Sequence, residues 1–348
     1  MRIAFVIPSL IQQGPVIVAH DLICGLMKEG HYCKVYYFDD CKVTTQQSFP
    51  CEVEKIKFSK KIAFAEYDIV HSHCLRGDAY VFFHKPLHTK TRFVSTVHNF
   101  VMKDLATQYN HWVALPFGNL WMLMLTRHDM RVVLSKTAMA YYKRWFGHRR
   151  LTYVYNSRYI DVSETLSKSE LLELEEFKGN STLLGINALL TPRKGVDMII
   201  RALPLLPNFK LFVVGDGKSI EDLQRLATKY DICDRVYFAG RRPKAYRYLP
   251  YYDIYMMPSR SEGFPLALLE AIALKKNIVC SDIPIFQEIL NPDEVHFFRL
   301  EDIESLVEAV KDAVKNDTSE RAYAHYLKDY TLEHFTKSYL RIYRNLLA

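Results

Sequence analysis

Two glutamates stand on either side of a Gly-Phe-Pro turn in the stretch "SRSEGFPLALLE". Glu262 comes before the turn, and Glu270 follows eight positions later in a segment with helical spacing. A carboxylate can accept two hydrogen bonds from a vicinal diol such as that of ribose. A helix N-terminus offers free N–H groups and a partial positive charge to phosphate. The stretch predicts a sugar-nucleotide site, the alternative being one surface glutamate and one helix glutamate in an ordinary helical segment.

The turn must be positioned by a strand before it and a helix after it. The run "DIYMMPS" (253–259) has the composition of a buried strand, and Gly263 lets the backbone approach a ligand closely. Pro265 can occupy the first helical position without losing a hydrogen bond. Similar apolar runs alternate with helix-length segments along the whole chain, which predicts doubly wound, parallel α/β sheets.

This alternation occurs twice, so the 348 residues favour two domains over one. We expect one Rossmann-like domain at 1–160, a partly helical, charged linker at 161–180 and a second Rossmann-like domain at 181–330. The last segment, 331–348, is expected to form a helix that packs back on the first domain. Two such domains facing each other across a cleft would bring their C-terminal strand ends to the crevice, where ligands bind.

Charge is unevenly distributed between the two halves. Residues 1–160 carry 21 Lys and Arg against 11 Asp and Glu, whereas the remainder carries 25 against 28. The basic first half suggests contact with an anionic partner, with solvated surface charge as the alternative. Nucleic acid is not expected, because no recognised binding module is present and the basic excess is modest.

Cysteine usage and the apolar segments bear on location. The seven Cys contain no C-x-x-C pair and are odd in number, so neither a zinc cluster nor a disulfide framework is indicated. The opening "MRIAFVIPSL" is interpreted as a buried strand rather than a signal peptide. The stretch 112–126 is too short and too interrupted to span a bilayer. We therefore expect a cytoplasmic protein, peripheral on the inner face of the cell membrane.

The motifs taken together resemble retaining glycosyltransferases of family 4, which have the GT-B fold. "SEGFPLALLE" is similar to the family's E-x7-E signature, and "LLTPRKGVDMIIRAL" to its Lys-Gly stretch. "LFVVGDGKSIEDLQRLA", "RVYFAGRRP" and "YNSRYID" resemble further family elements, and in the first half "LMKEGHYCKVYYF", "DIVHSH" and "STVHN" follow in the family's order. The resemblance implies that the first domain binds the acceptor and the second domain binds the nucleotide sugar.

The resemblance also implies roles for individual residues. Glu270 would bind the ribose, Glu262 the transferred sugar, and Lys194 the diphosphate, while His98 would lie near the reacting carbon. The remaining donor contacts would come from Gly14 at the phosphates, from Gly263, Phe264 and Leu266 at the sugar and diphosphate, and from Gly215, Gly240 and Arg241 at the nucleobase. His71 and His73 are candidate acceptor contacts.

No cofactor or metal is expected. The departing nucleoside diphosphate requires stabilisation of charge on a phosphate oxygen. Metal-dependent transferases commonly use D-x-D, but no two Asp in this chain are two positions apart. Lys194 together with a helix N-terminus can supply the positive charge instead.

Each site residue has a simpler structural interpretation. His98 ends an apolar strand, where a satisfied structural histidine is common, and a polar strand end explains His71 and His73 equally well. Lys194 and Gly195 could simply precede a helix. Asp216 is interpreted as a turn residue only and is not assigned to the site.

The chain departs from the family pattern at several positions. The expected Gly-Gly of the first half is Gln13-Gly14, followed by Pro15. Leu189 stands where an Arg is expected. Arg193, beside Lys194, is a candidate substitute for that Arg, but its side chain is expected to point elsewhere if the local geometry is kept. After Asp282 the usual Gly-Gly is Ile283-Pro284, although Glu288 is retained.

All three Trp lie between residues 112 and 145. The segment "KRWFGHRR" (143–150) combines aromatic and basic residues and favours contact with an anionic membrane surface. For residues 119–125 the preferred interpretation is an ordinary buried helix that packs a Trp stripe into the core.

We expect a retaining, metal-independent glycosyltransferase that moves a hexose-type sugar from a UDP- or GDP-sugar to a hydroxyl. The acceptor would be a surface glycan or a glycolipid, as in the synthesis of capsule, lipopolysaccharide or lipid-linked oligosaccharide. One alternative is a non-catalytic GT-B partner subunit of a glycosyltransferase complex, suggested by Gln13 and Leu189. A sugar-nucleotide epimerase of similar architecture is a further alternative, but none of its sequence features is found.

Overall fold

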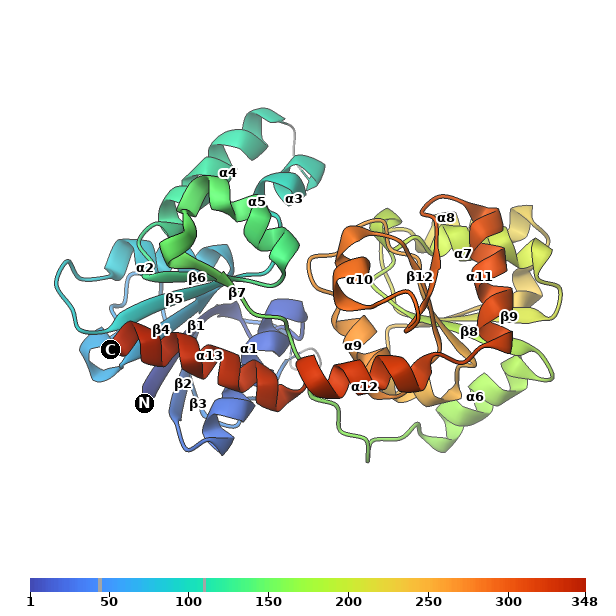
Figure 1. The fold of residues 1–348 in the computed structure, drawn as a ribbon, viewed down its shortest axis with the longest axis horizontal. Helices are drawn as coiled ribbons and strands as arrows, with labels where there is room; N and C mark the ends of the chain where they lie inside the picture. The colour runs from blue at the N-terminus through green and yellow to red at the C-terminus, as the bar shows by residue number, and fades with distance from the viewer. Residues whose placement is uncertain (43–45, 109–110) are drawn as a thin grey trace. The chain divides into compact units, whose positions relative to one another are not determined.

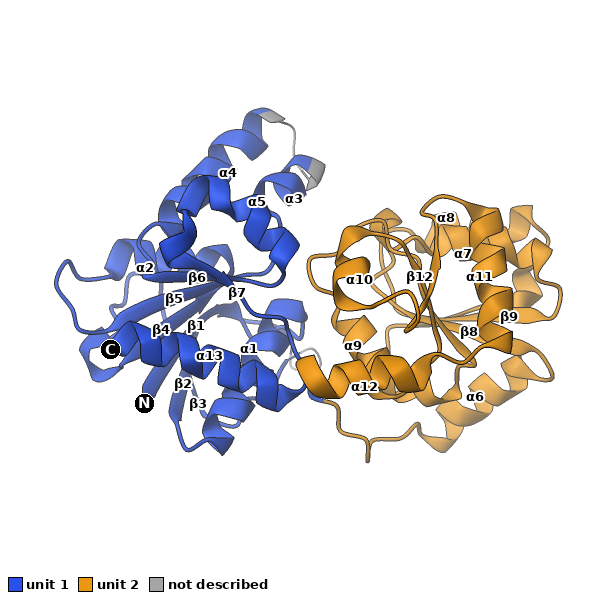
Figure 2. Ribbon diagram, viewed as in Figure 1, with its two compact units in different colours: residues 1–159, 330–348 blue, residues 160–329 orange. Residues whose placement is uncertain are grey.

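The computed structural model describes residues 1–42, 46–108 and 111–348, which form two compact units (Figure 2). Unit 1 comprises residues 1–159 and 330–348, and unit 2 comprises residues 160–329. Each unit is built around a parallel β-sheet with flanking helices (Figure 1). The predicted α/β class with two doubly wound, parallel domains is therefore confirmed.

The sheet of unit 1 is formed by β1 (Arg2–Ser9), β2 (Tyr32–Asp39), β3 (Glu52–Lys55), β4 (Ile69–His73), β5 (Arg92–Val97), β6 (Met130–Val133) and β7 (Leu151–Tyr153). Their order in the sheet is β3-β2-β1-β4-β5-β6-β7, and all neighbouring strands are parallel. Phe5 of β1 pairs in register with Val35 on one side and with His71 on the other. Residues 3–7 are completely buried, as a central strand covered on both faces requires.

The helices of unit 1 are α1 (Gly14–Lys28), α2 (Cys74–His84), α3 (Val101–Gln108), α4 (His111–Leu125), α5 (Lys136–Phe146) and α13 (Leu332–Leu347), with 3₁₀ turns η2 (Phe64–Glu66) and η3 (His148–Arg150). Although α13 is made after unit 2, it packs on α1 and β5 (Figure 1). Gly25 permits the close approach of α1, because a Cβ there would lie 1.9 Å from Oγ1 of Thr336.

The sheet of unit 2 is formed by β8 (Thr182–Asn187), β9 (Phe209–Val214), β10 (Val236–Gly240), β11 (Ile254–Met257), β12 (Ile278–Ser281) and β13 (His296–Phe298). These parallel strands are ordered β10-β9-β8-β11-β12-β13. Around them lie α6 (Lys168–Lys178), α7 (Val196–Ala202), α8 (Ile220–Lys229), α9 (Leu266–Ala273), α10 (Pro284–Ile289), α11 (Ile303–Lys315) and α12 (Ser319–Asp329). Four 3₁₀ segments, η4 (Pro192–Lys194), η5 (Leu203–Leu205), η6 (Cys233–Arg235) and η7 (Ala245–Tyr251), complete the unit.

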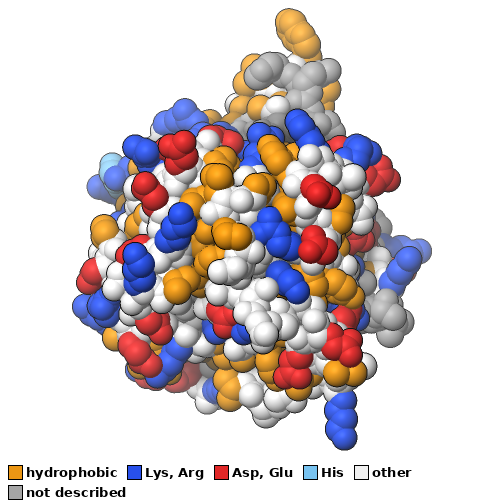
Figure 3. All heavy atoms as spheres, turned by 90° about the vertical axis from the view of Figure 1, so that its right-hand side faces the viewer, with side chains coloured by type: hydrophobic (Ala, Val, Ile, Leu, Met, Phe, Trp, Pro, Cys, Tyr) orange, Lys and Arg blue, Asp and Glu red, His pale blue; other side chains and the backbone are white. Residues whose placement is uncertain are grey.

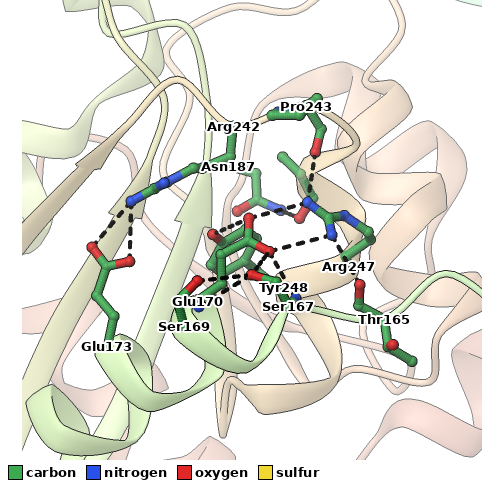
Figure 4. Close-up of polar contacts among 11 residues, drawn as sticks. Thr165, Ser167, Ser169, Glu170, Glu173, Asn187, Arg242, Pro243, Arg247 and Tyr248 are labelled. Carbon is green, nitrogen blue, oxygen red and sulfur yellow. Dashed lines mark hydrogen bonds and ion pairs between the residues drawn. The ribbon is translucent and has the colours of Figure 1, made fainter.

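The range 161–180, which the sequence assigned to a linker, lies within unit 2. It contains α6, whose N-terminus is closed by a capping box between Ser167 and Glu170. Glu170 also accepts hydrogen bonds from Arg247 and Tyr248, and Glu173 is paired with Arg242 (Figure 4). These contacts join α6 to η7 and to Arg242, which precedes η7, so the charged residues of α6 form ion pairs and hydrogen bonds within unit 2.

Unit 1 carries 24 Lys and Arg against 12 Asp and Glu, whereas unit 2 carries 22 against 27. The face shown in Figure 3, which belongs mainly to unit 2, accordingly mixes basic, acidic and apolar side chains. Within the parts of the chain that the structure describes, no helix has the length and apolar character needed to cross a membrane.

Candidate functional site

The turn between β11 and α9 has the strand-turn-helix form that the sequence predicted. All four residues of β11 are buried, and α9 begins at Leu266. Pro265 takes the N-cap position, one residue before the predicted place, and its carbonyl accepts the N–H groups of Leu268 and Leu269. Leu266 therefore belongs to the first turn of α9. The backbone N–H groups of a first turn have no acceptor within the helix itself.

Glu262 is the centre of a charged cluster at this turn. Its side chain is buried, and Oε1 accepts hydrogen bonds from Nζ of Lys194 at 2.6 Å and from Oγ of Ser259 at 2.7 Å. Burial alone would raise the pKa of Glu262, but the positive charges of Lys194 and Arg193 outweigh it and lower the pKa. The carboxylate is therefore held ionised and oriented.

Arg193 does not point away from the site, contrary to the expectation from sequence. Its Nη1 lies 3.1 Å from Oε2 of Glu262 and donates to the carbonyl of Ser261 at 2.7 Å. Since η4 is a single tight turn, the long Arg193 side chain can extend to the same carboxylate as its neighbour Lys194. Two cations therefore share the Glu262 carboxylate.

The backbone around Lys194 is fixed from two sides. Gly195 has φ +68°, and a Cβ there would lie 1.9 Å from the carbonyl oxygen of Pro258. The backbone N–H of Arg260 donates to the carbonyl of Arg193 at 2.8 Å. The guanidinium of Arg260 binds both carboxylate oxygens of Asp197, at 2.8 and 2.9 Å. Position 195 therefore requires a glycine. The Lys194-Gly195 pair is fixed by its packing against the residues after β11, besides preceding a helix.

Glu270 lies on α9, one element further along than Glu262. The pKa of the buried phenol of Tyr255 is raised first by burial and then by the charges of Glu270 and Glu262. Both carboxylates therefore act on the same β11 side chain. Gly263 and Phe264 lie between them in the turn, and the Phe264 side chain is buried.

The residues predicted at the nucleobase come together at the ends of β9 and β10. The N–H of Gly215 donates to the carbonyl of Gly240 at 2.9 Å. Gly215 is held against the loop after β8, because a Cβ there would lie 1.8 Å from the carbonyl oxygen of Ala188. Gly240 has φ +72°, and Arg241 is exposed beside it. Loop packing therefore explains Gly215, whereas the positive φ explains Gly240, whose Cβ would meet nothing within 4 Å. Leu189, next to Ala188, is 65% exposed.

The remaining predicted site residues belong to unit 1. Gly14 opens α1 and is exposed, and its backbone lies outside the left-handed region. A Cβ built on Gly14 meets no described atom within 4 Å. The fold therefore does not require a glycine at this position, unlike Gly195.

His98 is joined to a buried pair of histidines. Its Nε2 lies 2.8 Å from Nδ1 of His73, and the two rings are stacked. His71 is bonded through Nδ1 to the hydroxyl of Tyr343 at 2.7 Å and through Nε2 to Oγ1 of Thr96 at 2.8 Å. Burial lowers the pKa of His98 to about 3, so its imidazole is neutral at physiological pH.

This geometry corrects the assignment of His71 and His73 as acceptor contacts. Both side chains are completely buried, so neither can touch an acceptor directly. His71 is better interpreted as a residue of a polar strand end, because both of its ring nitrogens have hydrogen-bond partners. His73 can act on a substrate only through His98, and Nε2 of His73 is buried without a partner among the described atoms.

Three contacts at the site were not found from the sequence: those of Ser259 and Arg193 with Glu262, and that of Tyr343 with His71. Ser259 stands three positions before Glu262 in a turn-forming stretch, which is a usable local signal. The other two join residues that are far apart in the chain, and no spacing rule predicts them. Among the residues that the structure describes, no group of three His, Cys, Asp or Glu could hold a metal ion.

Comparison with known proteins assigns the chain to a family. Residues 168–330 match the family described as glycosyl transferases group 1. Over 358 aligned positions the chain is 30% identical to the O-antigen biosynthesis glycosyltransferase WclY of Escherichia coli, with 99% of each chain covered. The chain belongs to the group 1 glycosyltransferases.

Solved structures show the fold of this glycosyltransferase. The crystal structure of HepE from Anabaena, in complex with UDP-glucose, has a TM-score of 0.82 at 17% identity and covers 99% of this chain and 100% of that one. WaaG, a glycosyltransferase involved in lipopolysaccharide biosynthesis, has a TM-score of 0.72 at 18% identity, with 98% and 99% covered. The predicted GT-B fold is thereby confirmed.

Proposed function

We propose that this glycosyltransferase moves a hexose-type sugar from UDP- or GDP-sugar to a hydroxyl of a surface glycan or glycolipid, with retention at the anomeric carbon. The bond from the anomeric carbon to a phosphate oxygen breaks, and a bond to the acceptor oxygen forms. The nucleoside diphosphate leaves with the electron pair. The role of the relative WclY in O-antigen biosynthesis supports an acceptor of the lipopolysaccharide type.

The observation that carries the proposal is the cluster of Glu262, Lys194 and Arg193. A carboxylate has about four lone-pair positions, and Glu262 uses three of them for Lys194, Arg193 and Ser259. One acceptor position remains for a sugar hydroxyl. The two cations would stabilise charge on the departing diphosphate without a metal ion.

The other residues complete the proposed donor site. Glu270 would bind the ribose hydroxyls, and the amides of Gly263, Phe264 and Leu266 would face the sugar and diphosphate. Gly215, Gly240 and Arg241 would border the nucleobase. From unit 1, Gly14 would pass its backbone near the phosphates, and the neutral imidazole of His98 would lie near the reacting carbon.

Two experiments test this function. A thermal-shift screen with UDP, GDP, ADP and their common sugars should single out one nucleotide, because tight binding stabilises the fold by mass action. Purified protein with a panel of nucleotide sugars should then release nucleoside diphosphate steadily. Nucleotide binding without any release, with or without acceptor extracts, would contradict the catalytic assignment.

A non-catalytic partner subunit is the second candidate. The exposed Leu189, at a position where the family pattern has an arginine, favours it because one diphosphate cation is lost. Arg193 would compensate in part for the lost cation, since its guanidinium reaches the same turn as Lys194. Release of nucleoside diphosphate by the isolated chain excludes this candidate.

A further inference from the structure

Helix α1 carries a cysteine, a histidine and an aspartate in mutual contact, and none of the three belongs to the proposed donor site. Nε2 of His20 lies 3.5 Å from Sγ of Cys24, one helical turn further along. Nδ1 of the same ring lies 2.9 Å from Oδ1 of Asp21. The imidazole therefore connects a thiol with a carboxylate, which is the arrangement that activates a cysteine for nucleophilic chemistry.

Asp21 is held in place by the last residues of unit 1. Its side chain is completely buried, and Oδ2 accepts hydrogen bonds from the backbone N–H of Tyr159 at 3.0 Å and from Nη1 of Arg158 at 3.2 Å. Its other oxygen, Oδ1, faces the His20 ring. The carboxylate is therefore fixed from a distant part of the chain, and it orients the imidazole toward Cys24.

The His20 ring carries a positive charge beside the thiol. Burial alone would lower the pKa of His20, but hydrogen bonds to Asp21 and Cys24 outweigh it and raise the pKa to about 9. The imidazole is therefore protonated at neutral pH. A neighbouring positive charge favours the thiolate of a cysteine, which is its nucleophilic form. Cys24 is partly exposed, so a small solute can reach it.

Two further thiols lie near Cys24. Cys33 is buried on β2, a strand on which α1 packs, and Cys51 directly precedes β3. Because Glu52 of β3 pairs with Lys34 of β2, Cys51 and Cys33 take adjacent positions on the two parallel strands. The three cysteines therefore come together from one helix and two neighbouring strands.

The segment before β3 also lies against α1. The ring of Phe49 contacts that of His20, with 5.6 Å between the centroids. Burial raises the pKa of Cys33 to about 12 and that of Cys51 to about 11, so both remain thiols at neutral pH. Cys51 is the more exposed and the more acidic of the two. Within the described ranges no three His, Cys, Asp or Glu residues could hold a metal ion, so thiol chemistry fits this cluster better than metal binding.

We propose that Cys24 is a peroxide-sensitive modification site, activated by His20, that forms a disulfide with Cys51. The Cys24 thiolate attacks one oxygen of a hydroperoxide. An S–O bond forms, the O–O bond breaks, and the second oxygen leaves as hydroxide or alkoxide, so that the sulfur is oxidised to a sulfenic acid and the peroxide is reduced. The Cys51 sulfur then attacks the oxidised sulfur, and the departing hydroxide takes the Cys51 proton and leaves as water. The proposal does not depend on the donor chemistry, since no nucleotide sugar takes part.

Competition among the seven thiols of the unchanged chain tests the activation step. All seven are free, and Cys233 is exposed, whereas Cys24 is partly buried. The reduced full chain is treated with less than one equivalent of hydrogen peroxide in the presence of dimedone, which traps sulfenic acid, and the labelled peptides are quantified by mass spectrometry. We expect the label on Cys24 to exceed that on Cys233 at least about tenfold. If exposure alone governs reactivity, Cys233 is labelled first, and that result would overturn the proposal.

A matched pair of histidine variants tests the role of His20. His20→Asn removes the positive charge and keeps a polar side chain, so it should slow the labelling of Cys24 at least about tenfold and leave that of Cys233 unchanged. His88→Asn, at an exposed position, should leave both rates unchanged. Thermal unfolding checks that each variant is folded. Equal Cys24 labelling in the two variants would overturn activation by His20.

Peptide mapping without reductant tests the disulfide step. After peroxide treatment without dimedone, the unchanged chain should contain a Cys24–Cys51 disulfide that dithiothreitol removes. Cys51→Ser should stop the oxidation at the sulfenic acid of Cys24. Cys41→Ser, another partly exposed cysteine between β2 and β3, should still form the disulfide. A disulfide between Cys24 and Cys33, or a sulfenic acid that persists in the unchanged chain, would overturn the assignment of Cys51.

Discussion

Nζ of Lys194 lies 2.6 Å from Oε1 of Glu262, so the cation proposed for the diphosphate and the carboxylate proposed for the sugar form one charged pair. Both residues belong to unit 2, and the pair is held within the loops after β8 and β11. Each partner therefore orients the other, and a change at either residue affects both proposed functions.

Lys194→Met should destabilise the fold by about 2–4 kcal/mol, because it leaves the buried Glu262 with one cation fewer. Adding Glu262→Gln should recover part of this loss, since the uncompensated charge disappears. Urea unfolding of both single variants and the double variant gives the coupling energy. Additivity within about 0.5 kcal/mol would show that the pair is not energetically coupled.

Glu270→Ala should leave a folded protein that binds its nucleotide at least about tenfold more weakly, because the charge-assisted hydrogen bond proposed between Glu270 and the ribose would be lost. Titration calorimetry with the nucleotide chosen by the thermal-shift screen measures the effect. Glu308→Ala, an exposed glutamate on α11, serves as the control. Unchanged affinity in Glu270→Ala would remove this residue from the donor site.

Two glycine variants separate a structural role from a ligand-binding one. Gly195→Ala should lower the free energy of unfolding by about 2 kcal/mol or more, through its positive φ and its contact with Pro258. Gly14→Ala should change it by less than about 0.5 kcal/mol yet weaken donor binding. A Gly14→Ala protein with full donor affinity would place the phosphates away from this backbone.

The histidine cluster should make the fold acid-sensitive. Burial lowers the pKa of His71, His73 and His98 below the ordinary value. Below about pH 6.5 the unfolded chain therefore binds more protons than the folded one, and the free energy of unfolding decreases as pH falls.

His73→Phe should reduce that decrease by up to about 1.4 kcal/mol per pH unit, because one depressed titration is removed. Urea unfolding at neutral and mildly acid pH measures it, with His88→Phe at an exposed position as the control. The same variant removes the hydrogen bond to His98, so catalysis should fall while donor affinity stays. An unchanged pH slope would contradict the assignment of depressed pKa values.

Metal removal should leave the transferase active, because in the proposed mechanism Lys194 and Arg193 supply the positive charge at the diphosphate. The measurement is nucleoside diphosphate release before and after exhaustive chelation, followed by re-addition of Mg²⁺ or Mn²⁺. Loss of turnover on chelation and its recovery on re-addition would contradict metal independence.

The sequence predicted the fold and the order of elements around the donor site well, because buried parallel strands and local turns leave local signals. Three of the predicted features are contiguous motifs: the run before Glu262, the region around Pro265 and the Lys194-Gly195 pair. It did not predict that Arg193 and Lys194 meet on one carboxylate, or that His71 is bonded to Tyr343. Such contacts depend on packing between segments that are distant in sequence, and burial decided against His71 and His73 as acceptor contacts.

The path of the chain also sets an order of assembly during synthesis. Unit 2 is continuous, whereas unit 1 is interrupted by it and is completed only by residues 330–348. Until α13 emerges from the ribosome, His71 and Thr96 lack the hydroxyls of Tyr343 and Tyr339, and the face of α1 that receives Thr336 is uncovered. Unit 2 can therefore reach its native state first, while unit 1 waits as an incomplete intermediate with exposed apolar surface.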